Sequence, residues 1–252
     1  MMLSERSSDS HKGENGKVAV IGGSIDYAGA PALSAQAALR TGADLTKILT
    51  SHKIKNTVAS YSENLIVRDY RGEYFNQDAL KKARKLEKWA DMTIIGPGLG
   101  QPQHKAVKNF SKISEKPLTI DADAIGHLDL SKLSNAIITP HRQEFKQLKP
   151  SLDTLLQNDN IILRKGPVDK IYTSSGTTEV ELGHPGMTVG GTGDILTGIV
   201  ASLVAQGLEK EEAAIRAAKI NGKAGEKAAR KYGNGVVATD LLKRIPKVIL
   251  EN

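Results

Sequence analysis

The sequence predicts an α/β protein whose mainly parallel sheet is covered by helices on both faces. Short apolar segments alternate along the chain with segments of helical periodicity. Strands that are buried on both faces are almost continuously apolar, and their alternation with helices is typical of parallel sheets. The 252 residues contain no linker, repeat or low-complexity stretch, so we expect a single domain over 1–252, with residues 1–10 flexible.

The predicted strands share one feature, which is a polar or glycine-rich segment directly after the last apolar residue. These strands lie over 17–21, 92–95, 118–120, 136–138 and 160–163. Helices are predicted over 30–41, 78–90, 143–148, 194–206 and, as the final helix, 211–231, with a hairpin formed by 170–173 and 177–182. Ligands of open α/β sheets bind at the edge where the strands end, so we expect the site there.

Composition narrows the possible functions. The net charge of +7 favours an anionic ligand, whereas aromatic residues make up only 4% and argue against a single-stranded nucleic-acid partner. The basic run over 81–85 has the spacing of a solvated helix face. The chain has no cysteine, no apolar stretch of membrane-spanning length and no signal peptide near its start, so we expect a cytoplasmic protein without membrane contact.

The most informative segment is a glycine-rich loop over 186–193 that leads into the helix predicted from Asp194. Glycines let backbone amides approach an anion closely, and a helix N-terminus adds partial positive charge. A carboxylate beside a resting phosphate would repel it. Asp194 is better explained as a base that takes a proton from a hydroxyl while the amides hold the phosphoryl group in transfer. The structural alternative is a helix cap, a position that aspartate favours.

Other strand ends carry candidate polar groups. Asp121 and Asp123 follow the third predicted strand and are placed to anchor a metal, bind ribose hydroxyls or cap the next helix. His141 follows the fourth strand, and Glu144 lies three residues later. A lone histidine is more often structural, and no ligand spacing for zinc is present.

Two further segments have competing interpretations. The segment 165–167, Lys-Gly-Pro, suits either contact with a nucleotide phosphate or base, or a simple strand-to-hairpin turn. The segment 96–100, Gly-Pro-Gly-Leu-Gly, superficially suggests a dinucleotide fingerprint. It lacks the correctly spaced third glycine, and Pro97 removes an amide donor, so a Rossmann dehydrogenase remains a weak alternative. A Walker-type phosphate loop is absent.

The order of these motifs is more specific than any one of them. From His11 to the last predicted helix, the chain contains H-K-G-x-x-G, G-G-S-x-x-Y-x-G-A-P, G-P-G-L-G, D-A-D-A, T-P-H-x-x-E, K-G-P and G-M-x-x-G-G-T-G-D-x-L-T-G. This succession resembles the ADP/ATP-dependent NAD(P)H-hydrate dehydratases of the ribokinase-like superfamily. The resemblance implies a ribokinase-like three-layer α/β/α sandwich with a mainly parallel central sheet.

The resemblance also implies a reaction. Family members repair hydrated NADH or NADPH: a nucleotide, with ADP favoured over ATP, phosphorylates the ring hydroxyl, and loss of phosphate restores the reduced cofactor. Asp194 matches the family's general base, and the amides of Gly191, Thr192 and Gly193 match its anion hole. Magnesium is the implied cofactor, and Glu144 stands where the superfamily's glutamate organises the ion and phosphate through water.

Binding residues follow from the same alignment of motifs. The hydrated dinucleotide is expected to contact the strand-end and helix-start positions Ala30, Gly98, Asp121, Asp123, His141 and Asp194. The adenine nucleotide is expected to contact Lys165, Gly166, Pro167, Val168, Asp169 and Gly193. No nucleic-acid partner is implied, and the resemblance suggests a homo-oligomer, such as a tetramer.

The chain departs from the family pattern at three places. Arg142-Gln143 stands where Pro-Gly is common, Asp44 replaces a glycine, and His184 replaces an asparagine. The chain has no room for the epimerase domain often fused in this family, so we expect the dehydratase activity alone. The alternative functions are a ribokinase-like kinase of a vitamin precursor or sugar, and a non-catalytic nucleotide-binding regulator. An intact Asp194 argues against the regulator.

Overall fold

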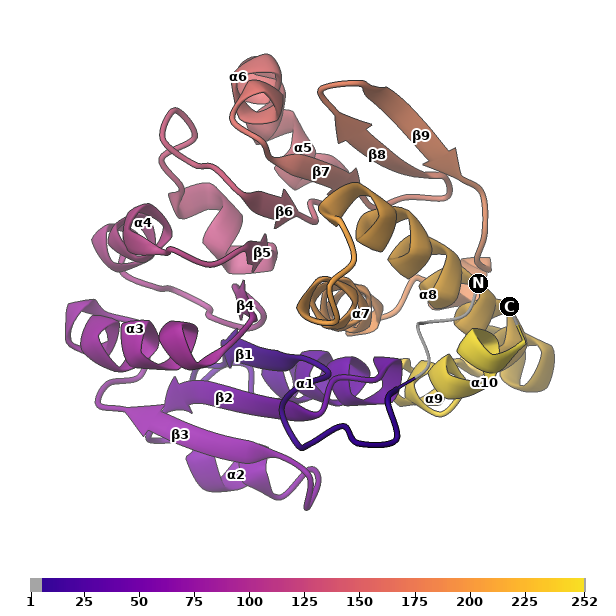
Figure 1. Cartoon of the computed structure of the whole chain (residues 1–252), viewed down its shortest axis with the longest axis horizontal. Helices are drawn as coiled ribbons and strands as arrows, with labels where there is room; N and C mark the ends of the chain where they lie inside the picture. Colours follow the sequence, from indigo (N-terminus) through magenta and orange to yellow (C-terminus); the bar gives the residue numbers. More distant parts are fainter. Residues whose placement is uncertain (1–5, 252) are drawn as a thin grey trace.

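A computed structural model describes residues 6–251 as one nine-stranded sheet with helices on both faces (Figure 1). The strand order is β3-β2-β1-β4-β5-β6-β7-β8-β9. Neighbours from β3 to β7 pair in parallel, and β7, β8 and β9 pair antiparallel. The predicted three-layer α/β/α class with a mainly parallel sheet is therefore confirmed.

The strands are short, as expected of a sheet buried on both faces. They are β1 (Lys17–Ile21), β2 (Leu45–Ser51), β3 (Ile66–Tyr70), β4 (Met92–Ile95), β5 (Leu118–Ile120), β6 (Ala136–Ile138), β7 (Ile161–Arg164), β8 (Asp169–Thr173) and β9 (Gly176–Val180). The helices are α1 (Gly29–Thr41), α2 (Lys55–Ala59), α3 (Leu80–Trp89), α4 (His104–Ile113), α5 (Arg142–Leu148), α6 (Leu152–Gln157), α7 (Thr192–Ala205), α8 (Lys210–Tyr232), α9 (Ala238–Leu242) and α10 (Ile245–Leu250).

Alternate residues of β1 and of β7 join different hydrophobic cores on the two faces of the sheet. In β1, Ala19 and Ile21 join the core beneath α3 and α4, whereas Val18 and Val20 join the core beneath α1. The same period of two divides β7, because Ile162 lies on the α3 side and its neighbours lie on the α7 and α8 side. Both faces are apolar, so the strands show continuous apolar runs in the sequence.

Several elements differ from the sequence-based expectation. Strands β2 and β3 and helix α4 were not predicted, because their segments mix apolar with polar and basic residues. The prediction that 211–231 is the final helix is wrong, since α9 and α10 follow it. These last helices have five and six residues, which is too short for a helical period to be recognised.

Helices α1 and α7 pack closely against each other on one face of the sheet, as seen near the centre of Figure 1. A Cβ at Gly198 would overlap the carbonyl oxygen of Ser34, so this contact requires glycine. The Ser34 hydroxyl in turn donates to the carbonyl oxygen of Asp194 at 3.0 Å. The packing of the two helices therefore fixes the N-terminal turn of α7.

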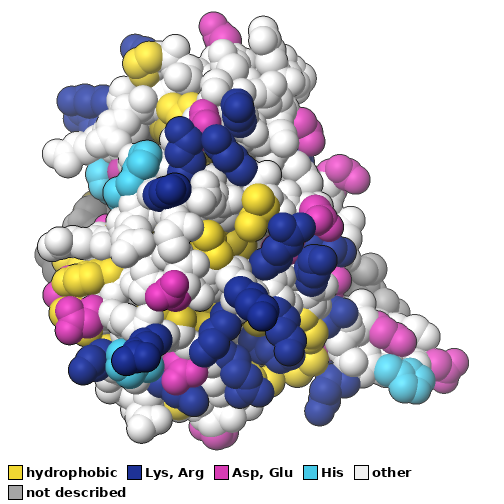
Figure 2. Space-filling view, turned by 90° about the vertical axis from the view of Figure 1, so that its left-hand side faces the viewer, with side chains coloured by type: hydrophobic (Ala, Val, Ile, Leu, Met, Phe, Trp, Pro, Cys, Tyr) yellow, Lys and Arg dark blue, Asp and Glu magenta, His cyan; other side chains and the backbone are white. Residues whose placement is uncertain are grey.

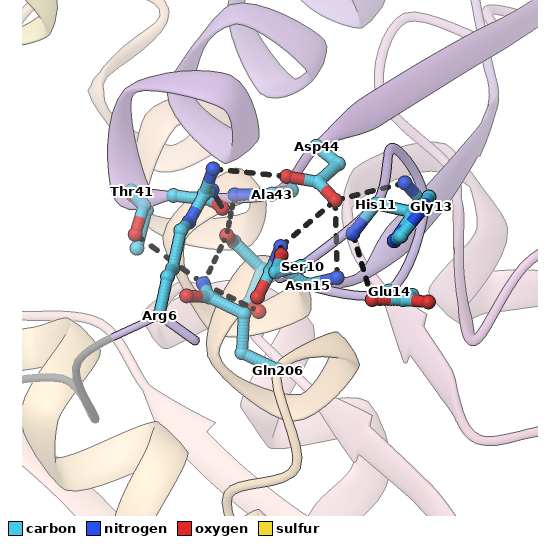
Figure 3. A network of polar contacts seen from close by, with 12 residues as sticks. Arg6, Ser10, His11, Gly13, Glu14, Asn15, Thr41, Ala43, Asp44 and Gln206 are labelled. Carbon is cyan, nitrogen blue, oxygen red and sulfur yellow. Dashed lines mark hydrogen bonds and ion pairs between the residues drawn. The ribbon is translucent and has the colours of Figure 1, made fainter. Parts of the chain in front are cut away.

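Asp44 ties the segment before β1 to the body of the protein (Figure 3). Its carboxylate accepts the amides of Gly13 and Asn15 at 2.8 and 3.1 Å and pairs with Arg6 at 3.1 Å. Burial raises the pKa of Asp44, but the hydrogen bonds from Asn15 and Gly13 outweigh it, so the pKa is lowered. The sequence predicts that residues 1–10 are flexible. Residues 1–5 lie outside the described residues, whereas Arg6 is bound by this network.

The basic residues lie over α3 and α4. Figure 2 views the side on which these helices lie in Figure 1, and lysine and arginine side chains gather there. Lys81, Lys82 and Lys85 of α3 are exposed, as predicted for a solvated helix face. Within residues 6–251, no helix is both long enough and apolar enough to span a membrane.

Candidate active site

The candidate site lies at the edge of the sheet where β4, β5, β6 and β7 end and where α7 begins. Gly98 follows β4, Asp121 follows β5, His141 follows β6 and Lys165 follows β7. The parallel pairing brings these strand ends together, because parallel neighbours end on the same side of a sheet. The motifs that are scattered along the sequence therefore converge on one region.

The glycine-rich loop ends in a helix start whose amides are free. Gly191 is the N-cap of α7 with a φ of 97°, a left-handed conformation that favours glycine. The first intrahelical hydrogen bond runs from the Ile195 amide to the Gly191 carbonyl at 3.1 Å. The preceding amides, of Thr192, Gly193 and Asp194, have no acceptor within the helix. A helix start of this kind favours an anion, so the predicted role of this loop has a physical basis.

Asp194 does not cap this helix. It occupies the third position of α7, and the N-cap Gly191 makes no side-chain capping bond. Burial, together with the charge of the neighbouring Asp121 and against the opposing effect of Lys165, raises the pKa of Asp194 to about 7. A carboxylate with a pKa near neutrality can both take up and release a proton, which suits a general base. The helix-cap interpretation is therefore wrong.

Asp121 is the buried anchor of the site. It is 1% exposed, and its Oδ1 lies 2.6 Å from Nζ of Lys165. Its Oδ2 accepts the hydroxyl of Thr197 at 2.9 Å. The alternative in which Asp121 caps the following helical turn is wrong, because it makes no capping bond there. Instead it links the end of β5 to the end of β7 and to α7.

Asp123 points to the end of the neighbouring strand β4. Its Oδ2 accepts the amide of Gly100, which follows β4, at 2.8 Å. Burial raises the pKa of Asp123, and the charge of Asp121 adds to this effect despite the Gly100 hydrogen bond. Asp121 and Asp123 therefore have different partners, and the described residues contain no group of three or more metal-ligating side chains.

Gly98 and Ala30 meet where the loop after β4 touches the start of α1. Gly98 has a φ of 65°, and a Cβ placed on it would lie 3.1 Å from the Cβ of Ala30 and 2.9 Å from that of Tyr27. Two of the predicted dinucleotide-binding positions are thus adjacent. Tyr27, the tyrosine of the G-G-S-x-x-Y-x-G-A-P motif, lies beside them and is 56% exposed.

His141 is both a helix cap and part of a cavity wall. Its Nδ1 accepts the amides of Gln143 and Glu144, at 3.0 and 3.3 Å, while Glu144 Oε2 accepts the amide of His141 at 2.7 Å. This reciprocal pair is a capping box at the start of α5. The structural role of His141 is therefore confirmed. The capping box forms even though Arg142-Gln143 stands where Pro-Gly is common in the family. Burial raises the pKa of Glu144.

A cavity of about 680 Å³ opens beside these groups. It brings together residues from the ends of β6, β7 and β9, the glycine-rich loop, α7 and α8, and is lined by His141, Lys165, Gly166, Pro167, Asp169, Leu182, Gly183, His184, Pro185, Met187, Thr188, Val189, Thr192, Gly193, Leu196, Asn221 and Gly222. Lys165 and Gly193 are in contact across it, since a Cβ on Gly193 would lie 3.1 Å from the lysine Nζ.

The turn between β7 and β8 forms one wall of this cavity. Asp169 Oδ1 accepts the amide of Gly166 at 2.9 Å, which closes the turn around the exposed Pro167 and the half-buried Val168. Burial raises the pKa of Asp169 to about 6. The segment is therefore a strand-to-hairpin turn and also lines the cavity, so the two interpretations of Lys-Gly-Pro are compatible.

The structure divides the predicted binding residues unevenly. His141, Lys165 and Gly193 line the cavity, whereas Ala30, Gly98, Asp121, Asp123 and Asp194 lie outside its lining. The contributors that were not predicted include Thr197, which binds Asp121, and the cavity residues Leu182 and Asn221. Thr197 belongs to the G-G-T-G-D-x-L-T-G motif, which is the signal that could have identified it. Asn221 lies in an alanine-rich helix without a motif.

Comparisons with known proteins find close relatives of this chain. A sequence family described as NAD(P)H-hydrate dehydratase matches residues 18–247. The ADP-dependent (S)-NAD(P)H-hydrate dehydratase of Haloterrigena turkmenica is 39% identical and covers 94% of this chain and 93% of its own. The enzyme of the same name from Natrialba magadii is 41% identical over the same shares.

A solved structure gives the same result. The ADP/ATP-dependent NAD(P)H-hydrate dehydratase of Bacillus subtilis, co-crystallised with ATP and Mg²⁺, superposes with a TM-score of 0.81 at 25% identity. The match covers 99% of this chain and 94% of that one. A hydroxyethylthiazole kinase from Pyrococcus horikoshii, with a TM-score of 0.62 at 15% identity, shares the fold.

Proposed function

This chain belongs to the NAD(P)H-hydrate dehydratase family, and we propose that it uses ADP to convert hydrated NADH or NADPH into the reduced cofactor. The observation that carries the mechanism is Asp194, a carboxylate with a pKa near 7 in the turn whose free amides form an anion site. A binding protein gains nothing from a base at this position. A transferase needs a base and an anion site side by side.

In the first step, the ring hydroxyl of the hydrated cofactor attacks the terminal phosphorus of the nucleotide. Asp194 takes the hydroxyl proton as the new O–P bond forms and the bond to the leaving nucleotide breaks, which releases AMP from ADP. The amides of Gly191, Thr192 and Gly193 hold the phosphoryl oxygens, where charge develops. Lys165, 3.1 Å from the Cβ position of Gly193, places a positive charge at the same point.

In the second step, the C–O bond to the new phosphate breaks and the neighbouring ring carbon loses a proton. The electron pair of that C–H bond becomes the double bond that hydration had removed, and inorganic phosphate leaves. The protein holds the ring in place for this step through the proposed dinucleotide residues Ala30, Gly98, Asp121, Asp123 and His141. Asp121 acts by fixing Lys165 and Thr197.

The carboxylates fit magnesium only together with a nucleotide. Glu144 keeps one oxygen on the His141 amide, and Asp121 is committed to Lys165 and Thr197, so no dense oxygen cage is present among the described residues. Magnesium is commonly held by one or two carboxylates plus substrate phosphates and water. We therefore assign Glu144 to the ion through water, and the ion supplies charge neutralisation on the phosphates.

The nucleotide is assigned to the cavity. Lys165, Gly166, Pro167 and Asp169 line it at the β7–β8 turn, and Gly193 lies beside Lys165. Val168 belongs to the same turn, and we assign it to the nucleotide with them. The proposal includes three expectations from the sequence, namely that the protein forms a homo-oligomer, that it is cytoplasmic and that it functions as a single domain. The basic surface over α3 and α4 favours approach of two anionic ligands by long-range attraction.

The test is product analysis. Hydrated NADH is incubated with ADP or ATP and magnesium, while the absorbance of reduced nicotinamide and the inorganic phosphate are followed together. The proposal expects both products to appear in equal amounts and only with nucleotide. A small-molecule kinase, the alternative, would leave a stable phosphate ester of another substrate and no reduced cofactor. A non-catalytic regulator would bind nucleotide and release neither product.

A further inference from the structure

The cavity has two chemically different walls. One wall carries Lys165 and the start of α7, which suits phosphate. The other wall is formed where α8 meets the chain that leaves β9. Gly222 and Gly225 of α8 allow this contact, since a Cβ on Gly222 would lie 2.6 Å from that of Leu182 and a Cβ on Gly225 would overlap Met187. Glu226 fixes the same chain by accepting the Gly183 amide at 3.0 Å.

A single buried carboxamide belongs to this apolar wall. Asn221 lines the cavity, is only 7% exposed, and its Oδ1 has no hydrogen-bond partner. The other buried residues of α8 are apolar or glycine. Leaving a buried amide oxygen unpaired is unfavourable, and the native residues around it offer no donor. A ligand that brings a donor into the apolar side of the cavity removes this cost.

We propose that Asn221 reads the edge of the nucleotide base and selects adenine. This inference rests on the proposed nucleotide function. With the phosphates at Lys165 and Gly193, the base of the same nucleotide reaches the wall formed by Leu182, Met187 and Asn221. Apolar side chains cover the faces of the ring, and the carboxamide meets its polar edge.

The chemistry of the base edge explains the choice of residue. Adenine presents an amino donor next to a ring nitrogen acceptor, and an asparagine carboxamide matches both with its oxygen and its NH₂ group. Guanine presents a carbonyl acceptor and ring N–H and amino donors. A carboxylate, which only accepts, matches the two guanine donors and cannot donate to the adenine ring nitrogen. An Asn-to-Asp exchange therefore changes the base preference without changing side-chain size.

The experiment measures binding of ADP, GDP and inorganic pyrophosphate to the wild type, Asn221→Asp and Asn221→Leu by calorimetry, with thermal melting as the folding check. We expect Asn221→Asp to weaken ADP about 10-fold and to strengthen GDP relative to ADP by at least about 10-fold. Asn221→Leu should weaken ADP and leave the two nucleotides nearly equal. Pyrophosphate, which has no base, should bind all three proteins alike.

The control is Asn234→Asp, which adds the same charge to an exposed residue near the cavity rim, where its Cα lies 3.6 Å from the Cβ position of Gly186. It should keep the wild-type preference. An unchanged ratio of GDP to ADP affinity in Asn221→Asp, or an equal loss of pyrophosphate binding, would overturn the inference. If Asn221→Asp does not fold, Asn221→Leu decides by its loss of preference. Failure of the wild type to bind ADP would instead refute the proposed function.

Discussion

The ammonium group of Lys165 lies 2.6 Å from Oδ1 of Asp121, and this pair joins two motifs that are 44 residues apart in the chain. Asp121 follows β5, and Lys165 follows β7, two strands away in the sheet. The side chain of Asp121 is 2% exposed and that of Lys165 is 20% exposed. The lysine therefore neutralises a buried carboxylate and still reaches the cavity, where its charge is available to a phosphate.

We expect Lys165→Met to destabilise the protein by about 3 kcal/mol, because it leaves the buried Asp121 carboxylate without its charge partner. The double variant Lys165→Met/Asp121→Asn should recover much of this loss, since it removes the uncompensated charge. Denaturant unfolding of both variants and of Asp121→Asn gives the coupling free energy. If Asp121→Asn changes the stability of Lys165→Met by the same amount as it changes that of the wild type, the pair contributes no coupling.

We expect Asp194→Asn to lower turnover by about 10²–10⁴-fold, the usual effect of removing a general base. Nucleotide affinity should change little, because the amides of the α7 N-terminus stay in place. Turnover comes from the release of reduced nicotinamide, and affinity comes from calorimetry with ADP. Near-normal turnover in this variant would refute the assignment of Asp194 as base. Thr239→Ala, an exposed site in α9 outside the cavity lining, serves as a control.

The raised pKa of Asp194 predicts a pH dependence of both activity and stability. The base acts when deprotonated, so kcat/KM should rise with pH and level off above about 7. Between the unfolded pKa and about 7, the folded protein holds a proton that the unfolded chain has lost. The contribution of Asp194 to stability therefore falls as pH rises through this range. Asp194→Asn should remove this fall and be more stable than the wild type at pH 8 but not at pH 4.

The sequence predicts the fold well where both faces of a strand are buried. The segments 17–21, 92–95 and 118–120 are strands at the predicted bounds, because continuous apolar runs followed by glycine or aspartate are unambiguous. The strand predicted over 160–163 begins one residue later, at Ile161 of β7. Asn160 is buried before it, where its side chain accepts the Ala136 amide and donates to two backbone carbonyls. Strands β2 and β3, near one edge of the sheet, include charged residues, so they lack the continuous apolar run by which the other strands are predicted.

The site was predictable as a set of motifs but not as a network. Asp194 and the glycine-rich loop carry their chemistry in consecutive residues, so a local pattern reveals them. The hydrogen bonds of Asp121 with Lys165 and Thr197 depend on the strand order. This order brings Asp121 into contact with residues that lie 44 and 76 positions later in the chain. Asn221 gives no local signal at all, because its role arises from being buried unpaired beside a cavity.

Gly191 and Gly193 of the glycine-rich loop should respond differently to substitution. A Cβ on Gly193 would meet only the flexible end of Lys165 at 3.1 Å, so Gly193→Ala should fold normally and lower turnover by up to about 10²-fold through displacement of the lysine. On Gly191, the φ of 97° disfavours any side chain, and a Cβ would lie 2.6 Å from Leu33 and 2.8 Å from Ala238. Gly191→Ala should therefore lower the melting temperature as well. Thermal melting and turnover of both variants check this separation; normal turnover in Gly193→Ala would contradict it.

The two roles of His141 can be separated by comparing His141→Ala with His141→Asn. Loss of the cap should destabilise His141→Ala by about 1 kcal/mol, whereas asparagine is a favoured N-cap and should restore stability. Both variants lose the imidazole Nε2, which lies 3.3 Å from Oε1 of Glu144 on a side chain that is 52% exposed. We expect both to bind hydrated NADH about 3- to 10-fold more weakly, as for one lost hydrogen bond, and to bind ADP nearly as the wild type does.

Calorimetry with each ligand distinguishes the possible roles of His141. An equal loss for both ligands would mean that His141 shapes the whole cavity, and a loss confined to ADP would mean that it belongs with Lys165 in the nucleotide site. Wild-type affinities in His141→Asn would leave the cap as its only role.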